Sequence, residues 1–575
     1  MATTVNRTAQ EAEGAAAADS VGPEENVVLA AVDPMGFASA LVEVGRALTR
    51  NPLAAAGPWA RFAGGMALAG AATTARIFGG DAQGPAAPAP KDRRFADPAW
   101  RENPGYFLTM QSYLLGARLL HDLVDAAGLD ERTQLKAEFA AQQLVDALAP
   151  TNTLLNPTVL KRTLETGGLS LVRGLRTFLT DVVDNHGLPQ QVDRSAFAVG
   201  KNLAITPGKV VLRNELIELI QYEPQTETVY KVPLLCSPPW INKYYVMDLA
   251  PRRSFVEWAV QHGHTVFAIS YRNPDASMRS VGLHDYLLHG PHAALEVIEE
   301  ITGSTATNIV GLCLGGTLTT MLLAWLAQNE PERVNSATLL NTIVDFSRAG
   351  VLRAFTDEAA IASIEKQMEE TGFLDTRQMA TTFTMLRAND LLWNYVVNNW
   401  LLGNDPPAFD ILAWNADETR MPAAMHSFYL RACYLRNEFA TGRMELAGQR
   451  LDSTAITRDV YVLNAIEDHI APWRTGYQTT KVLSSARARF VLSSAGHIAG
   501  IVNPPSPKSV HWTNDELPPA PDLWLARATR HQASWWEDWA EWIGARAGSK
   551  QTPPPTGSDA HPALADAPGT YVHAA

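Results

Sequence analysis

The chain has 575 residues, of which 46% are hydrophobic and 19% are charged, and its formal net charge is −13. This composition is ordinary for a globular protein, and the length predicts two domains. The acidic balance argues against a nucleic-acid-binding protein, because neutralising phosphates requires clustered lysine and arginine side chains.

The amino-terminal segment, residues 1–94, is expected to be disordered or variable. It begins with small, polar and acidic residues and has no apolar stretch of the secretion-signal kind. Its most apolar part, "AGGMALAGAATTA" (63–75), is shorter than the roughly 20 residues that span a membrane. We expect a packed or surface helix there, with adhesion to a hydrophobic particle as the alternative. "GDAQGPAAPAPKDRR" (80–94) is typical of a linker.

Residues 95–202 are predicted to form a helical domain, because apolar residues recur at helical spacing, as in "YLLGARLLHDLVDAAG". After residue 202 the pattern changes to strands that alternate with helices. Such alternation predicts βαβ units and a mostly parallel sheet, so we assign residues 203–575 to an α/β catalytic domain. The segment at about 347–452 is largely helical and aromatic, and is expected to be a lid inserted above the sheet.

The segment "ASWWEDWAEWIGARAG" lies near the carboxyl end of the chain. It places four tryptophans near one helical face: Trp535, Trp536, Trp539 and Trp542. We expect this helix to dock onto the core, with contact to lipid or polymer as the alternative.

A short pattern, "GLCLG" (311–315), lies between the predicted buried strand "TNIVGLC" and a predicted helix. It fits the nucleophile elbow G-x-[S/C]-x-G, in which side chains at the glycine positions would crowd the neighbouring strand and helix. Cys313 would then lie at a helix amino terminus, whose positive potential favours the thiolate. The backbone N–H of Leu314 would point at the developing oxyanion. The alternative is that Cys313 is a small buried hydrophobic residue.

Two later segments favour the catalytic interpretation. In the α/β-hydrolase fold, to which the nucleophile elbow belongs, the acid and then the base follow the nucleophile along the chain. Asp468 follows the predicted strand "VYVLNA", and His497 follows the predicted strand "ARFVL". We therefore expect Cys313, Asp468 and His497 to form one catalytic site in an α/β-hydrolase fold. Glu467 and His469 flank Asp468 and could substitute for it, although an alternating strand end points them away.

The segment "SPPWINKYY" (237–245) follows the third predicted strand. In this fold that loop donates the second oxyanion N–H, and we predict that Ile241 is the donor.

Of the other two cysteines, Cys236 lies within a predicted strand and is expected to pack, whereas Cys433 lies in the predicted lid segment and has no obvious partner. Three cysteines in no paired spacing are too few for a disulfide framework and indicate a reducing, cytoplasmic compartment. No histidine pairs with a cysteine or carboxylate at metal-ligand spacing, and no glycine-rich phosphate loop is evident. We therefore expect neither a metal nor a cofactor.

A cysteine nucleophile suits acyl transfer. His497 would take the proton of Cys313, and the thiolate would attack an acyl carbonyl. The resulting thioester stays reactive and passes its acyl group to an alcohol when a lid excludes water. Hydrolysis by the same three residues, in a cysteine-dependent thioesterase or hydrolase, is the competing interpretation.

From residues 92–100 to its end, the chain resembles the polyhydroxyalkanoate synthases of the single-subunit type. The similarity is carried by several segments: "APTNTLLNPTVLKR", "ETGGLSL", "PPWINKYYVMDL", "GLCLGGT", "EDHIAPW", "GHIAGIVNPP" and "APGTYVH". The resemblance implies an acyltransferase that polymerises (R)-3-hydroxyacyl-CoA into polyester and releases coenzyme A. The acyl-CoA thioester is then a substrate and not a cofactor. "GLCLGGT" and "GHIAG" are similar to the short-chain-monomer enzymes, whereas the overall length and "APGTYVH" are similar to the medium-chain ones. We favour short-chain monomers, because residues near the pocket matter most for monomer fit.

The resemblance also implies roles for single residues. Cys313 would carry the growing chain as a thioester, and His497 would activate it. Asp468 would activate the 3-hydroxyl of the substrate, orient the imidazole, or do both. Trp414 is a candidate for the substrate pocket, with a packing role as the alternative.

The resemblance further implies a homodimer at the surface of a cytoplasmic storage granule, with granule-coat proteins as further partners. A non-catalytic granule-associated protein is a third interpretation of the chain.

Overall fold

A computed structural model describes residue 33, residues 35–90 and residues 92–574. The chain forms two units. The first comprises Met1–Leu148 and Glu358–Ser363, and the second comprises Ala149–Asp357 and Ile364–Ala575.

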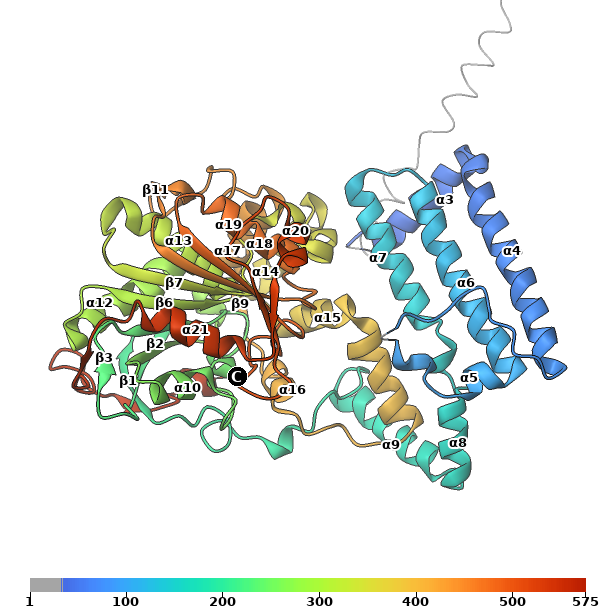
Figure 1. The fold of residues 1–575 in the computed structure, drawn as a ribbon, viewed down its shortest axis with the longest axis horizontal. Coiled ribbons are helices and arrows are strands. Elements are labelled where there is room, and N and C mark those ends of the chain that lie inside the picture. Colours follow the sequence, from blue (N-terminus) through green and yellow to red (C-terminus); the bar gives the residue numbers. More distant parts are fainter. Residues whose placement is uncertain (1–32, 34, 91, 575) are drawn as a thin grey trace, which may run out of the picture. The chain divides into compact units, whose positions relative to one another are not determined.

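In its described residues the first unit is helical. Its helices are α3 (Phe37–Arg50), α4 (Pro52–Ile77), α5 (Ala99–Glu102), α6 (Pro104–Ala126) and α7 (Glu131–Ala147). Helices α4, α6 and α7 lie side by side in Figure 1. Helix α4 approaches α6 closely at Gly65, where a Cβ atom would lie 2.7 Å from the Cδ2 atom of Leu115. A side chain at residue 65 would therefore require the Leu115 side chain to move, and glycine allows the two helices to pack closely without this change.

Because α3 and α4 cover residues 37–77, the expectation of a disordered or variable segment over residues 1–94 is wrong for this part of the chain. Alanine and glycine dominate α4 and bury little surface each, but they allow close packing on α6, which composition does not reveal. The packed-helix interpretation of residues 63–75 is confirmed. Among the described residues, no helix has both the length and the apolar character needed to cross a membrane. Residues 1–32 lie outside the described residues.

The second unit contains an eleven-stranded sheet in its described residues, in the order β15-β14-β13-β12-β7-β6-β4-β5-β2-β1-β17. The central strands pair in parallel and are β13 (Arg487–Ser493), β12 (Asp459–Ala465), β7 (Val334–Leu340), β6 (Thr307–Leu312), β4 (Leu234–Ser237) and β5 (Val266–Tyr271). The outer strands pair antiparallel and are β15 (Thr529–His531), β14 (His511–Thr513), β2 (Ile217–Tyr222), β1 (Gly208–Arg213) and β17 (Ala565–Asp566). The sheet is therefore mixed: the expectation of parallel pairing is correct for the six central strands, and the expectation of a mostly parallel sheet is wrong for the outer strands, which follow hairpin-like and carboxyl-terminal segments instead of βαβ units.

Helices lie against this sheet in Figure 1. They include α10 (Phe255–Gln261), α11 (Leu283–Leu287), α12 (Ala293–Thr302), α13 (Leu314–Asn329), α18 (Trp473–Tyr477), α19 (Thr479–Val482), α20 (Pro521–Ala526) and α21 (Trp535–Gly544). Helix α13 is buried over most of its length, which is why its sequence is apolar on every face. Strands β3 (Val229–Tyr230) and β16 (Lys550–Gln551) form a small separate pair.

The segment between β7 and β12 is largely helical, as the sequence predicts. We call it the lid below, although its role as a cover stays a prediction. It contains α14 (Glu358–Thr371), α15 (Thr376–Leu386), α16 (Asp410–Asn415) and α17 (Ala423–Tyr429), with the π-helical turns η9 (Asn389–Trp393), η10 (Val396–Leu401) and η11 (Leu430–Leu435). Two short strands, β8 (Phe373–Leu374) and β9 (Met421–Pro422), pair antiparallel within it.

Helices α8 (Pro157–Glu165) and α9 (Leu169–Asp184) belong to the second unit, so the expected domain boundary at residue 202 differs from the boundary after Leu148. These helices belong to the second unit because α9 contacts the turn η10 of the lid. The Trp400 Nε1–H donates to Asp181 (2.7 Å), and the ring of Phe178 lies 4.9 Å from that of Trp400. These contacts join segments about two hundred residues apart, which local periodicity does not predict.

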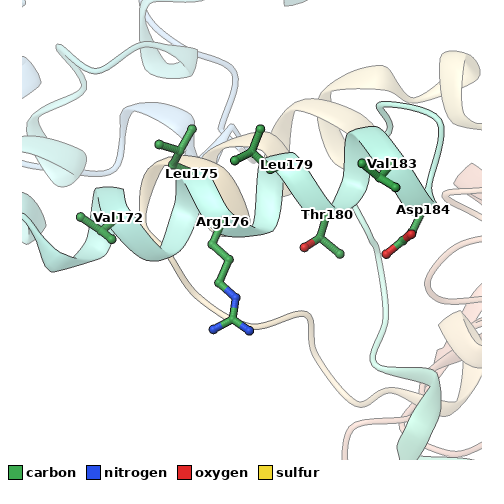
Figure 2. Close-up of a pocket in the computed structure, with 7 residues that line it drawn as sticks. All are labelled: Val172, Leu175, Arg176, Leu179, Thr180, Val183 and Asp184. Atoms are coloured by element: carbon green, nitrogen blue, oxygen red, sulfur yellow. The ribbon is translucent and has the colours of Figure 1, made fainter.

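The outer face of α9 is apolar and exposed. Val172, Leu175, Leu179 and Val183 recur along it, and each is at least 55% exposed. They help to line a hollow of about 490 Å³ (Figure 2), whose residues are Val172, Leu175, Arg176, Leu179, Thr180, Val183 and Asp184.

Helix α21 docks onto the core, which confirms the packing interpretation of the tryptophans. Trp535, Trp536 and Trp539 are at most 1% exposed. Their indole N–H groups donate to Gly500 O (3.0 Å), Ile501 O (2.9 Å) and Thr338 Oγ1 (2.9 Å). The first two bonds hold the chain a few residues after His497, so this helix supports the loop that follows β13.

We expect Trp535→Ala to lower the free energy of unfolding of the second unit by about 3–5 kcal/mol, because it removes a fully buried ring and a hydrogen bond. Urea unfolding followed by circular dichroism would measure this change. Trp59→Ala is the control, since Trp59 is 52% exposed in the first unit, and it should change stability by about 0.5 kcal/mol or less. Equal effects of both substitutions would contradict a packing role for the α21 tryptophans.

Candidate active site

Cys313 lies at the turn between β6 and α13 and has a strained backbone, with φ 53° and ψ −117°. A positive φ is costly for a residue with a side chain and persists only where the surroundings impose it. Here the Cys313 N–H donates to Leu340 O of β7 (2.8 Å), and the Cys313 carbonyl accepts from the N–H groups of Gly316 and Thr317. The predicted elbow is therefore present, with its side chain half-buried.

Glycines flank Cys313 because neighbouring backbone leaves no room for a side chain. A Cβ at Gly315 would lie 2.1 Å from Ser237 O at the end of β4. A Cβ at Gly311 would lie 2.6 Å from Gly316 Cα in α13. The sequence-based reason for both glycines, crowding against a strand and a helix, is confirmed.

Asp468 and His497 meet in the loops that follow β12 and β13. Their side chains are joined by a hydrogen bond of 2.6 Å between His497 Nδ1 and Asp468 Oδ2. The second carboxylate oxygen of Asp468 accepts from the backbone N–H groups of Ile470 (2.8 Å) and Ala471 (2.9 Å). The Asp468 side chain is fully buried. Both oxygens are thus held by protein groups, which fixes the carboxylate against the imidazole.

The pKa of His497 depends on both of its neighbours. Burial of the imidazole lowers this pKa, but the negative charge of Asp468, followed by that of Cys313, and the hydrogen bond to Asp468 outweigh burial. The pKa of His497 is therefore raised well above its ordinary value. The structure brings together the three residues that the sequence predicts, with the imidazole between the sulfur and the carboxylate.

The two neighbours of Asp468 do not take its place. Glu467 is exposed, and its backbone N–H donates to Ala495 O (3.0 Å). Burial, followed by the charge of Arg387, lowers the pKa of His469 to about 4, so this imidazole is neutral at physiological pH. The carboxylate that contacts His497 is that of Asp468.

Asn341, which the sequence analysis missed, connects the elements of the site. It follows β7 with φ 46°, a conformation that asparagine tolerates better than most residues. Its side-chain oxygen accepts from Ala465 N–H at the end of β12 (2.8 Å), and its amide donates to His497 O. The sequence signal that could have identified this residue is an asparagine directly after a buried strand.

Two lid tyrosines, Tyr429 and Tyr434, were also missed. Their rings lie 5.5 Å apart in an edge-to-face arrangement. Burial raises the pKa of both hydroxyls, and the charge of Cys313 contributes to both shifts, so both lie near the sulfur. Tyr429 is 6% exposed and Tyr434 is half-buried. No feature of the sequence distinguishes them from other aromatic residues of the lid.

The two predicted oxyanion donors lie on the expected elements. Leu314 is the first residue of α13, and Ile241 lies in the loop after β4. That loop begins beside the elbow, because the Ser237 carbonyl oxygen would lie only 2.1 Å from a Cβ atom at Gly315. Their role as donors stays a prediction.

Trp414 is 2% exposed, and its indole N–H donates to Lys243 O (2.7 Å). It belongs to the apolar core against which Cys313 packs. The contact supports the packing alternative for Trp414, although the ring remains close to the site. Burial raises the pKa of the Cys236 and Cys433 thiols, as expected for packing residues. Among the described residues, no group of three or more potential metal-ligating side chains comes together.

Comparison with known proteins adds family matches over most of the chain. Residues 91–259 match the family described as the poly-beta-hydroxybutyrate polymerase (PhaC) N-terminus, and residues 238–504 match the α/β hydrolase fold. The poly(3-hydroxyalkanoate) polymerase of Methylorubrum extorquens is 44% identical, covering 93% of this chain and 90% of that protein. A polymerase subunit from Cupriavidus necator is also 44% identical, covering 84% and 83%.

Solved structures were compared as well. A hydrolase from Pseudomonas aeruginosa is 16% identical, with a TM-score of 0.29, covering 51% of this chain and 95% of that one. A meta-cleavage product hydrolase from Pseudomonas fluorescens is 12% identical, with a TM-score of 0.27, covering 53% and 92%.

We expect Asp468→Asn to lower the pKa of His497, because it removes the charge that most stabilises the imidazolium. The Cys313 thiolate then loses its cationic partner, so alkylation of Cys313 by iodoacetamide at neutral pH should slow at least tenfold. Mass spectrometry of the modified peptide would measure the rate. Glu467→Gln is the control and should leave the rate within twofold. Equal slowing in both variants would contradict the assignment of Asp468.

Proposed function

The chain belongs to the poly(3-hydroxyalkanoate) polymerase family, and we propose that it polymerises (R)-3-hydroxyacyl-CoA into polyester and releases coenzyme A. The observation that carries this proposal is the buried Asp468–His497 hydrogen bond beside the elbow cysteine, in a chain 44% identical to a named polymerase over 93% of its length. The enzyme class is then acyltransferase.

In the first step, the Cys313 thiolate attacks the carbonyl carbon of the acyl-CoA thioester. A new sulfur–carbon bond forms, the bond to the coenzyme A sulfur breaks, and coenzyme A leaves with a proton from the His497 imidazolium. The N–H groups of Leu314 and Ile241 would stabilise the oxyanion formed in between.

In the second step, the hydroxyl oxygen of another hydroxyacyl-CoA attacks the carbonyl carbon of the Cys313 thioester. An oxygen–carbon ester bond forms, the sulfur–carbon bond breaks, and Cys313 leaves as the thiolate. The lengthened acyl-CoA reloads Cys313 by the first step, so the polyester grows by one unit. The His497 imidazole accepts the hydroxyl proton as general base. Asp468 has both oxygens bonded within the protein, one to His497 and one to two backbone N–H groups, which favours its role in orienting the imidazole. Tyr429 is buried and Tyr434 is half-buried, and this pair supports exclusion of water, which favours transfer over hydrolysis.

We propose short-chain monomers such as 3-hydroxybutyryl-CoA, on the motif resemblance alone. We also propose that the enzyme is a homodimer that acts in the cytoplasm at the surface of the polyester granule, where granule-coat proteins can join it. The exposed apolar face of α9 (Figure 2) supports attachment to an apolar surface.

Purified protein given (R)-3-hydroxybutyryl-CoA should release coenzyme A and form insoluble polyester, because the acyl group is passed to a hydroxyl and not to water. Thiol titration measures coenzyme A, and gas chromatography after methanolysis measures polymer. Cys313→Ala should abolish both products, while circular dichroism stays unchanged. Soluble 3-hydroxybutyrate in equal amount to coenzyme A would overturn the proposal in favour of a hydrolase.

The double substitution Leu175→Asp and Leu179→Asp should reduce cosedimentation with amorphous polyester particles at least fivefold, since it places charges on the apolar face of α9. Coenzyme A release from substrate in solution, before polymer appears, should stay within twofold. The matched control is Leu523→Asp, at a residue 40% exposed on α20. Unchanged cosedimentation of the double variant would contradict a role of α9 in attachment.

A further inference from the structure

The carboxyl-terminal motif "APGTYVH" (567–573) has no part in the chemistry above, yet a buried charge holds it on the sheet. Glu218 of β2 is fully buried and accepts from Thr570 N–H (2.8 Å), the Thr570 hydroxyl (2.8 Å) and Tyr571 N–H (3.0 Å). Arg213 pairs with the same carboxylate. Val572 is 3% exposed within the main core. The last residues of the chain are therefore docked.

Ala574, near the end of this docked segment, contacts Lys243, which lies in the loop after β4. Lys243 is 3% exposed, and its ammonium group donates to Ala574 O (2.5 Å). A buried ammonium loses its hydration, so its fixed hydrogen-bond acceptor constrains where the side chain lies. Asn273 also reaches the Ala574 carbonyl (3.5 Å).

The same loop is held on its other side by the lid. Lys243 O accepts from the Trp414 indole N–H (2.7 Å). Trp240 O accepts from the Thr419 hydroxyl (2.7 Å), and Ile241 O accepts from Thr419 N–H (3.4 Å). Ile241, the predicted oxyanion donor, thus lies between two anchored residues, in a loop whose first carbonyl touches the elbow.

We propose that residues 570–574 are a positioning strap, which fixes the loop after β4 through Lys243 and so holds the Ile241 N–H beside Cys313. Lys243 and the strap are positioning residues, because they contact the loop and not the substrate. This inference rests on the oxyanion role proposed above for Ile241.

The test separates a reaction that builds an oxyanion from one that does not. With p-nitrophenyl acetate, the Cys313 sulfur attacks the carbonyl carbon, an oxyanion forms, the carbon–oxygen ester bond breaks, and p-nitrophenolate leaves. With iodoacetamide, the same sulfur displaces iodide from a saturated carbon, and no oxyanion forms. Displacement of a donor should therefore slow the first reaction and spare the second.

Lys243→Met and deletion of residues 571–575 should each lower the rate of the p-nitrophenolate burst at least fivefold relative to the rate of alkylation of Cys313. Removal of a whole oxyanion donor costs about a hundredfold or more. Both rates are referred to folded protein, whose fraction is measured by circular dichroism, because iodoacetamide also alkylates the thiols of unfolded chains. Lys243→Arg, which keeps a donor, should restore at least part of the loss.

Lys481→Met is the matched control. Lys481 also donates from a partly buried ammonium to a backbone carbonyl, that of Leu517 (2.7 Å), but this bond does not reach the loop. In Lys481→Met, the ratio of the p-nitrophenolate burst rate to the alkylation rate should stay within twofold of the wild-type ratio. The proposal is overturned if the ratio falls less than fivefold in Lys243→Met and in the deletion, or falls equally in Lys481→Met. Failure of the polymerase proposal is distinct, because wild type would then make no polymer from hydroxyacyl-CoA while this ratio stays measurable.

Discussion

The hydrogen bond between Asp468 and His497 places a carboxylate and an imidazole in the interior of the protein, where an ionised group is costly unless its partners are fixed. The fold meets this constraint by joining the carboxyl ends of parallel strands. Strand β12 leads to Asp468, β13 leads to His497, and β6 leads to Cys313. Asn341 links the end of β12 to the carbonyl of His497. Since these strands are neighbours with β7 in the sheet order, a shift of one strand would displace the whole site.

The surroundings of the sulfur explain why a cysteine serves there. A thiolate beside an imidazolium is a nucleophile at neutral pH, and its acyl thioester remains reactive toward alcohols. Such an intermediate is useful for polymer growth only if water is kept away. Tyr429 and Tyr434 contribute side chains near Cys313, and the indoles of α21 hold the chain that follows His497, so aromatic side chains pack around this edge of the sheet.

The sequence predicted those features that local pattern determines. The spacing of glycines around Cys313 and the chain order of acid and base identified the elbow, the sheet and three residues that the structure brings together. A helix was expected at residues 63–75, but the helical structure of residues 37–62 was missed, because the segment was assigned as a whole from its small and polar residues. The place of α9 depends on Trp400, and the contact of Lys243 depends on Ala574, far along the chain. Asn341 and the lid tyrosines were missed for the same reason, since their neighbours come from other segments.

Intact-protein and peptide mass spectrometry of enzyme quenched within its first turnovers would examine the covalent intermediate itself. With (R)-3-hydroxybutyryl-CoA, the account predicts 3-hydroxybutyryl groups attached to Cys313, in a series that lengthens by one repeat unit at a time. Acyl groups on another residue, or polymer formed with Cys313 unmodified throughout, would contradict it.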